Sequence, residues 1–220
     1  MTNSVRNVVA AELGKLRTLP AVPVTVAVTI LAMLGLAAAF AANAAGTGLR
    51  AVNYGQLGLI VLGILTAASE YSSGQIRTSL ASVPNRALLL VGKVLAYLAV
   101  AAPVSLLAVA GSAALGGVPV LTARSLGATT YLTLIGLLGL AAAVVLRSLA
   151  GTFALMATLV LVASPLLVSV TALARYLPDR AGMQLYQPGD LTAIHGGAVM
   201  TAWIMAALTL AIVTFVKRDA

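Results

Sequence analysis

The chain has 220 residues, of which 61% are hydrophobic and 8% are charged, whereas soluble globular domains are about 45–50% apolar. This composition excludes an ordinary soluble domain, and the absence of cysteine excludes a disulfide framework and a thiolate metal site. The net charge of +8 does not indicate nucleic acid, because the bases gather at the ends of apolar runs and are not interleaved with aromatic residues.

Residues 3–18 combine apolar and charged positions with a helical period. The pattern predicts an amphipathic helix lying in the membrane interface; the alternative is a frayed cytoplasmic tail. The apolar positions are Val5, Val8, Val9, Leu13 and Leu16, and Arg6, Glu12, Lys15 and Arg17 are expected on other faces. Pro20 and Pro23 mark the start of the first span, since proline is tolerated in the first turn of a helix.

Six long apolar runs follow, each with few or no charges. Such runs are typical of transmembrane helices, which need about 20 residues to cross the hydrocarbon core. We therefore predict an all-α integral membrane protein with six transmembrane helices, forming one transmembrane domain over residues 1–220. The predicted spans are 21–42, 54–69, 94–115, 126–146, 149–174 and 197–216.

The distribution of lysine and arginine predicts the orientation. An even number of spans places both termini on one side, and that side holds nine of the 13 bases, while the other three loops hold four. The positive-inside rule then places both termini in the cytoplasm of a multi-pass plasma-membrane protein. Segment 70–93 becomes cytoplasmic, and the loop 175–195, with Asp179 and Asp190, becomes extracellular.

Catalytic patterns are missing from the sequence. Gly92-Lys93 is followed by Val94 and lacks the hydroxyl of a phosphate loop, so the chain is not expected to hydrolyse ATP by that route. One histidine, His195, cannot build a zinc site without cysteines. Glu70 is the sole acid at an inner span end, which disfavours a proton-driven carrier. We predict that the chain is not an enzyme and binds no metal or cofactor.

The polar interval 70–93 contains dense signals for helix starts and stops. Gly74 permits a bend, and Ile76 and Leu80 share one face of a short amphipathic helix. Pro84 ends that helix, and Asn85 is a suitable N-cap for the next one. The interval therefore predicts a compact cytoplasmic knob, with an ordinary positively charged loop as the alternative.

The same interval resembles the signature of the type-2 ATP-binding-cassette (ABC) transporter permeases. The resemblance lies in Glu70-Tyr71-x-x-Gly74-x-Ile76-Arg77-x-x-Leu80, then Pro84-x-Arg86 and Lys93, with Gln75 where threonine is more usual. Along the rest of the chain, the family is similar in its amphipathic helix with a Glu12-x-x-Lys15 pattern, its six spans, a helical loop before the last span, and a basic end such as Lys217-Arg218.

The resemblance implies a coupling helix that docks on a separate ATPase subunit, which would hold ATP and Mg²⁺. The residues implied in this docking are Arg77, Thr78, Ser79, Leu80 and Arg86. Glu70 would join the base of the second span to the N-terminal helix through Lys15 or Arg17. A second permease chain, identical or homologous, would complete the transport path.

The resemblance also implies export of cargo from the cytoplasm. Because the spans are mostly apolar, we expect an amphipathic or lipid-like cargo such as an antibiotic, a peptide or a lipid. Polar residues in or beside the second and fifth spans are candidates for the path: Asn53, Gln56, Thr66, Ser164 and Ser169. The alternative function is a non-transporting six-span scaffold or assembly factor, which would not need the knob.

Overall fold

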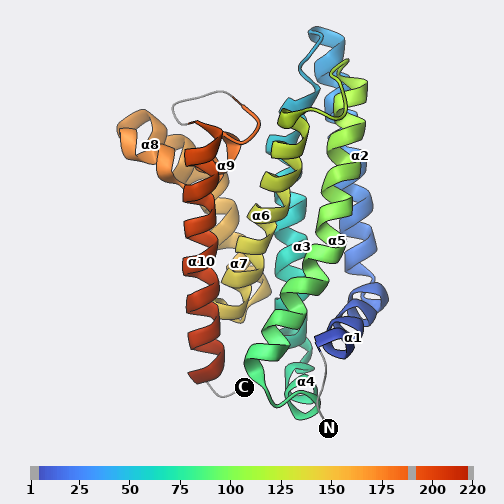
Figure 1. The fold of residues 1–220 in the computed structure, drawn as a ribbon, viewed down its shortest axis with the longest axis vertical. Coiled ribbons are helices and arrows are strands. Elements are labelled where there is room, and N and C mark those ends of the chain that lie inside the picture. Colours follow the sequence, from blue (N-terminus) through green and yellow to red (C-terminus); the bar gives the residue numbers. More distant parts are fainter. Residues whose placement is uncertain (1–4, 188–191, 218–220) are drawn as a thin grey trace.

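The computed structural model describes residues 5–187 and 192–217, and this part of the chain is helical with no strand. Six helical segments are long and apolar enough to cross a membrane, as in a multi-pass membrane protein. They stand roughly side by side (Figure 1). Their bounds are α2 Ala21–Asn43, η1 with α3 Gly48–Ser73, α5 Arg86–Leu115, α6 Ala123–Leu146, α7 to α8 Leu149–Val170, and α10 Ala193–Lys217.

Helices α3 and α6 form the centre of the bundle. In their most apolar stretches 72% and 67% of the residues are buried, against 17% in α2 and in α7 to α8. Gly63 of α3 faces Gly136 of α6, and a Cβ atom on Gly63 would overlap the carbonyl oxygen of Gly136. Two glycines therefore let the two helix backbones touch, as small residues do in membrane helix pairs.

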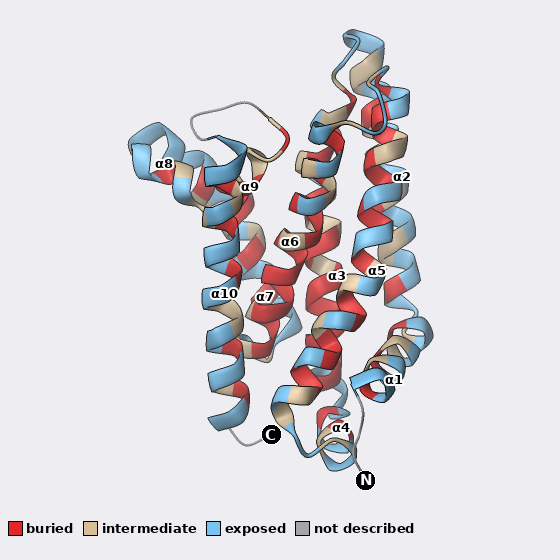
Figure 2. Cartoon of the chain, in the orientation of Figure 1, coloured by how far each residue is buried: buried red, intermediate tan, exposed pale blue. Residues whose placement is uncertain are grey.

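The outer helices expose apolar side chains rather than burying them. Leu31 of α2, Leu166 of α8 and Met205 of α10 are 60–68% exposed. Figure 2 shows burial concentrated along α3 and α6, while α8 and α10 are mostly exposed. Lipid solvates apolar side chains, so a membrane helix needs internal backbone hydrogen bonds but not a water-excluded outer face.

The fifth span is not the uninterrupted helix that the sequence predicts for 149–174. It consists of α7 (Leu149–Ala157), a π-helical segment η2 (Thr158–Ala163) and α8 (Ser164–Val170), followed by the 3₁₀ segment η3 (Ala172–Tyr176). Pro165 lies in the first turn of α8, where it supplies no backbone N–H. The hydrogen-bonding register changes just before it, and α8 departs from the direction of α7 (Figure 1).

The predicted knob is present as helix α4 (Ile76–Ser82). Helix α3 ends at Gly74, whose φ of 72° lies in the left-handed region that glycine adopts without strain. After α4, the Asn85 side chain accepts a hydrogen bond from the backbone N–H of Leu88 at 3.0 Å and so caps α5. Helices α1 (Val5–Thr18) and α4 and the end of α10 lie at the same end of the bundle (Figure 1).

The opposite end is more structured than the predicted loop 175–195. Helix α9 (Pro178–Met183) packs against α6 and α10, and a Cβ atom on Gly182 would overlap the ring of Tyr131. Asp179 is 3% exposed, so this acid is buried within the helical packing at this end of the bundle. Asp190 lies outside the described residues.

We predict that the two ends of the bundle face opposite sides of the membrane, with α4 inside. The chain has no native cysteine, so single cysteines can be introduced at Ser73 and at Leu121, both of which are exposed. With a membrane-impermeant maleimide, Ser73→Cys should react only from the cytoplasmic side and Leu121→Cys only from outside. Reaction of both from one side would contradict the six-span arrangement.

We also predict that Gly63→Ala lowers the melting temperature in detergent, because overpacking at a closed contact costs about 1–3 kcal/mol. Gly35→Ala in α2 is the matched control, since nothing lies within 4 Å of the Cβ position there. The control should be neutral or stabilising by up to about 1 kcal/mol through helix propensity. Equal melting temperatures for the two variants would show that the α3–α6 contact tolerates a methyl group.

Candidate functional site

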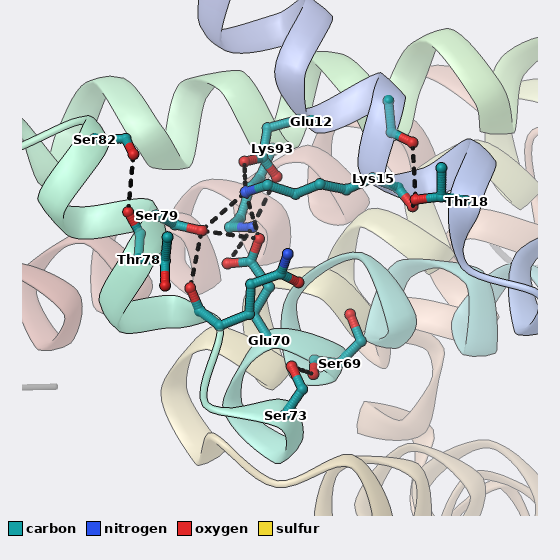
Figure 3. A network of polar contacts seen from close by, with 12 residues as sticks. Glu12, Lys15, Thr18, Ser69, Glu70, Ser73, Thr78, Ser79, Ser82 and Lys93 are labelled. Atoms are coloured by element: carbon teal, nitrogen blue, oxygen red, sulfur yellow. Dashed lines mark hydrogen bonds and ion pairs between the residues drawn. The ribbon is translucent and has the colours of Figure 1, made fainter.

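Four charged side chains meet where α1, α3 and α5 converge beside α4 (Figure 3). Lys15 Nζ lies 2.5 Å from Glu12 Oε1 and 2.6 Å from Glu70 Oε1. Lys93 Nζ lies 2.8 Å from Glu12 Oε2 and 2.8 Å from Glu70 Oε2. Each ammonium group therefore bridges both carboxylates, and each carboxylate oxygen has its own ammonium partner. We call these four residues the charge cluster.

The charge cluster is largely removed from solvent. Glu12 and Glu70 are each 3% exposed and Lys93 is 2% exposed, while Lys15 is half-buried. Burial alone lowers the pKa of Lys15, but hydrogen bonds and charge interactions with Glu12 and Glu70 outweigh it and leave the pKa above its usual value. Two acids and two bases neutralise one another, which is the condition under which buried charges are tolerated.

The sequence around Glu12 explains how α1 reaches the cluster. Val8, Glu12 and Leu16 recur every four residues, so they lie along one face of α1, and that face is the buried one. Opposite it, Gly92 of α5 leaves room for α1, because a Cβ atom there would overlap Cγ1 of Val8. The close approach lets Lys93, the next residue, reach Glu12.

The resemblance implied that Glu70 contacts Lys15 or Arg17 of the N-terminal helix, and the structure brings Glu70 and Lys15 together. Arg17, the other predicted partner of Glu70, is exposed and takes no part in the charge cluster. The expectation that Glu12 lies on another face of α1 than Val8 and Leu16 is wrong, because all three share the buried face. The spacing of Glu12 four residues from Val8 and from Leu16 was a sequence signal for its buried position. The sequence interpretation also missed Lys93 as a member of the cluster.

The predicted docking residues of α4 divide into two groups. Arg77 and Thr78 are exposed, and Leu80 is half-buried against the core. Ser79 instead points inward, where its hydroxyl accepts a hydrogen bond from Lys15 Nζ at 2.9 Å and donates to Glu70 Oε1 at 3.3 Å. Ser79 therefore belongs to the base of the knob and not to its exposed surface, because the helical period turns it toward α3.

Arg86, at the first turn of α5, has an intramolecular role. Its Nη1 donates hydrogen bonds to the carbonyl oxygens of Phe215 at 3.0 Å and Val216 at 3.3 Å. These carbonyls lie in the last turn described for α10, at the negative end of the helix dipole. Arg86 thus ties the start of the third span to the end of the sixth.

The candidate path residues do not gather along one path. At the end opposite α4, the Tyr131 hydroxyl donates to Gln56 Oε1, and the Tyr186 hydroxyl donates to Asn53 Oδ1 at 2.7 Å. The two tyrosine rings lie 5.6 Å apart between centroids. Gln56 and Asn53 are therefore occupied in joining α3 to α6 and to the segment after α9.

The other three path candidates are also separated from one another. Thr66 is buried and donates to the carbonyl oxygen of Leu62 in its own helix. Ser164 is buried and accepts a hydrogen bond from Arg180 Nε at 2.9 Å. Ser169 is exposed on α8. Burial raises the pKa of Asp179, next to Arg180, although the Ser164 hydroxyl and Arg180 oppose the shift.

A cavity of about 420 Å³ lies beside the charge cluster. Lys15 and Glu70 contribute charge to its wall, and hydroxyl groups come from Thr18, Ser69 and other residues of α1 and α3. A second, apolar hollow of about 230 Å³ lies along α3 and α7 and is lined by Val61, Ile64, Leu65, Leu149 and Phe153. Leu65 and Leu149 line both, so a cavity with charged and hydroxyl groups in its wall adjoins an entirely apolar hollow.

Within the described residues, no group of three or more histidine, aspartate or glutamate side chains is arranged to hold a metal ion. Comparison of the sequence with models of known protein families and with curated proteins gives no match.

We predict that Lys93→Met lowers stability by about 3–5 kcal/mol, the cost of breaking a buried ion pair and leaving its partners uncompensated. Lys217→Met, which removes an exposed lysine at the same end, should change the melting temperature little. The double variant Glu70→Gln/Lys93→Met should recover part of the loss, because one acid and one base remain. If Lys93→Met and Lys217→Met have the same melting temperature, the charge cluster does not hold α1 to α5.

Proposed function

We propose that the chain is the membrane-spanning permease subunit of an ABC-type exporter, driven by a separate ATPase that holds ATP and Mg²⁺. The observation that carries this proposal is the form of α4. It is a short helix at the end of the bundle, with Arg77 and Thr78 exposed on one side and Ile76 and Ser79 buried on the other. A helix presented in this way offers a docking surface to a protein outside the membrane.

The charge cluster supports a role for α4 in transmitting movement. Ser79 of α4, Glu12 of α1, Glu70 of α3 and Lys93 of α5 belong to one set of hydrogen bonds and ion pairs. A displacement of α4 by a docked ATPase would therefore be passed to the central helix α3 and to α5, not absorbed in a loose loop. Cargo would move only if it bound the two resulting states differently.

The adjoining cavities support an amphipathic or lipid-like cargo. The 420 Å³ cavity offers charged and hydroxyl groups, and the hollow along α3 and α7 offers apolar side chains. A molecule with a polar group and an apolar tail would fit both without burying unpaired polar atoms. An antibiotic, a peptide or a lipid has this character.

The distribution of bases supports an orientation in the plasma membrane with α4, α1 and both termini in the cytoplasm. In this orientation α1 lies at the membrane interface, and its exposed Arg17 lies at the headgroup level. A second permease chain, identical or homologous, would cover part of the exposed apolar surface of the outer helices and complete the path.

The alternative is a six-span scaffold or assembly factor without transport. It would share the close α3–α6 contact and the topology charges, since both serve membrane insertion and packing. It would have no use for an exposed helix whose base is fixed by a buried charge cluster. The presence of α4 in that form favours the permease.

The test is recovery of a complex with an ATPase, such as one encoded beside this chain's gene. The purified pair should hydrolyse ATP, and the isolated chain should not. Arg77→Glu should leave the free energy of unfolding within about 1 kcal/mol of wild type, and so change the melting temperature little, because an exposed charge contributes little to stability. It should weaken complex recovery and transport at least tenfold, since a reversed charge at a protein contact costs several kcal/mol.

Arg17→Glu is the matched control, because Arg17 is exposed at the same end but lies on α1. It should reduce complex recovery much less than Arg77→Glu. Normal complex recovery and normal transport by Arg77→Glu would contradict the proposed coupling role of α4. ATP hydrolysis by the verified single chain would contradict the proposal that a separate ATPase subunit hydrolyses ATP.

A further inference from the structure

A basic pocket of about 200 Å³ lies at the end of the bundle opposite α4, between the end of α8, η3 and α9. Its polar lining comes from Thr171, Arg175, Arg180 and Gln184, and the rest is apolar. Among the described residues around it, Asp179 is the one acid. Asp190 lies outside the described residues. Two guanidinium groups in one concave site are the usual means of binding phosphate or carboxylate.

The two arginines are only partly occupied by contacts within the described residues. Arg180 uses Nε to bind Ser164 Oγ at 2.9 Å, and the same nitrogen lies 3.8 Å from Asp179 Oδ2. Arg175 stacks on the ring of Tyr176 at 5.0 Å, and its buried Nε donates no hydrogen bond in the described part of the chain. Donors therefore remain on both side chains for a further acceptor.

Gln184 adds an acceptor to the same pocket. Its Nε2 lies 3.5 Å from the carbonyl oxygen of Arg180, whereas its Oε1 is buried and receives no hydrogen bond from the described residues. Buried polar atoms without partners are rare in folded proteins. A ligand that supplies a hydroxyl group next to its phosphate would satisfy Gln184 and the arginines together.

The surface that leads to the pocket is apolar. Leu166 and Val170 of α8 are 61% and 80% exposed, and Leu173 of η3 is 70% exposed. Leu166 and Val170 belong to the end of the fifth candidate span and Leu173 follows it, so these residues lie where acyl chains meet the headgroup layer. A free anion would use the arginines but not this surface, whereas a lipid would use both.

We propose that this pocket binds the phosphate of an anionic membrane lipid whose headgroup also carries a hydroxyl group. Arg175 and Arg180 donate to the phosphate oxygens, Gln184 accepts from the hydroxyl, and the acyl chains lie against α8. The proposal concerns binding alone, so it does not depend on the proposed export function.

The test uses the full chain, delipidated in detergent, with three probes: dioleoylphosphatidylglycerol, dioleoylphosphatidylcholine with the same acyl chains, and water-soluble glycerol 3-phosphate. Native mass spectrometry and melting temperature report binding. The phosphatidylglycerol should bind at least tenfold more tightly than the phosphatidylcholine and should raise the melting temperature more. Arg175→Gln/Arg180→Gln should lose this preference.

The matched control is Arg50→Gln/Arg124→Gln, which removes two exposed charges at the same end but outside the pocket. It should keep the preference. An equal effect of both lipids on the wild-type chain would overturn the proposal, as would equal losses in the two double variants. Equal stabilisation by glycerol 3-phosphate would show a site for soluble anions, and the lipid assignment would fail.

A measurement on the wild-type chain covers the case in which Arg175→Gln/Arg180→Gln does not fold. A phosphatidylglycerol with a photoreactive diazirine beside its headgroup should crosslink mainly within residues 164–184, and unlabelled phosphatidylglycerol should compete. Crosslinking that is spread over the spans or concentrated at the α4 end would overturn the assignment.

Discussion

The fold at the α4 end depends on the mutual neutralisation of four charges, of which Glu12, Glu70 and Lys93 are buried and Lys15 is half-buried. Moving a single ammonium or carboxylate out of water costs several kcal/mol even after relaxation, so none of the four could be buried alone. The cost is offset because each ammonium of Lys15 and Lys93 bridges both Glu12 and Glu70. The ion pairs form only if α1, α3 and α5 are all in place, so the charge cluster fixes the positions of these three helices relative to one another.

The rest of the bundle is organised by backbone contact rather than by charge. Lipid offers no hydrophobic reason for apolar helices to associate, so close packing and interhelical hydrogen bonds must hold them together. Gly63 and Gly136 bring α3 and α6 into contact, and the Tyr97 hydroxyl of α5 donates to the carbonyl oxygen of Thr133 in α6 at 3.0 Å. Together with the charge cluster, these contacts connect α3, α5 and α6 to one another and to α1 at the α4 end.

Sequence reasoning did well where the signal was local. The end of α3 at Gly74, the end of α4 before Pro84 and the start of α5 at the Asn85 cap follow from residues that each act on their own stretch of backbone. The sequence predicts the fifth span as one uninterrupted helix because hydropathy carries no information about the hydrogen-bonding register of the backbone. Pro165 and the π-helical segment before it interrupt the helix without lowering the apolar content. Side-chain roles were harder, and Ser79 was assigned to the docking surface although it faces the charge cluster.

By itself the sequence determined that the chain has six apolar segments, a short polar helix after the second and an excess of bases at one end. Those properties depend on composition and on residues a few positions apart. Only the tertiary structure decided that Lys93 meets Glu12, 81 positions away, and that Arg175, Arg180 and Gln184 share one pocket. Such pairings depend on how each helix is rotated and how closely it approaches its neighbours, and small residues such as Gly92 set that approach from the opposing helix.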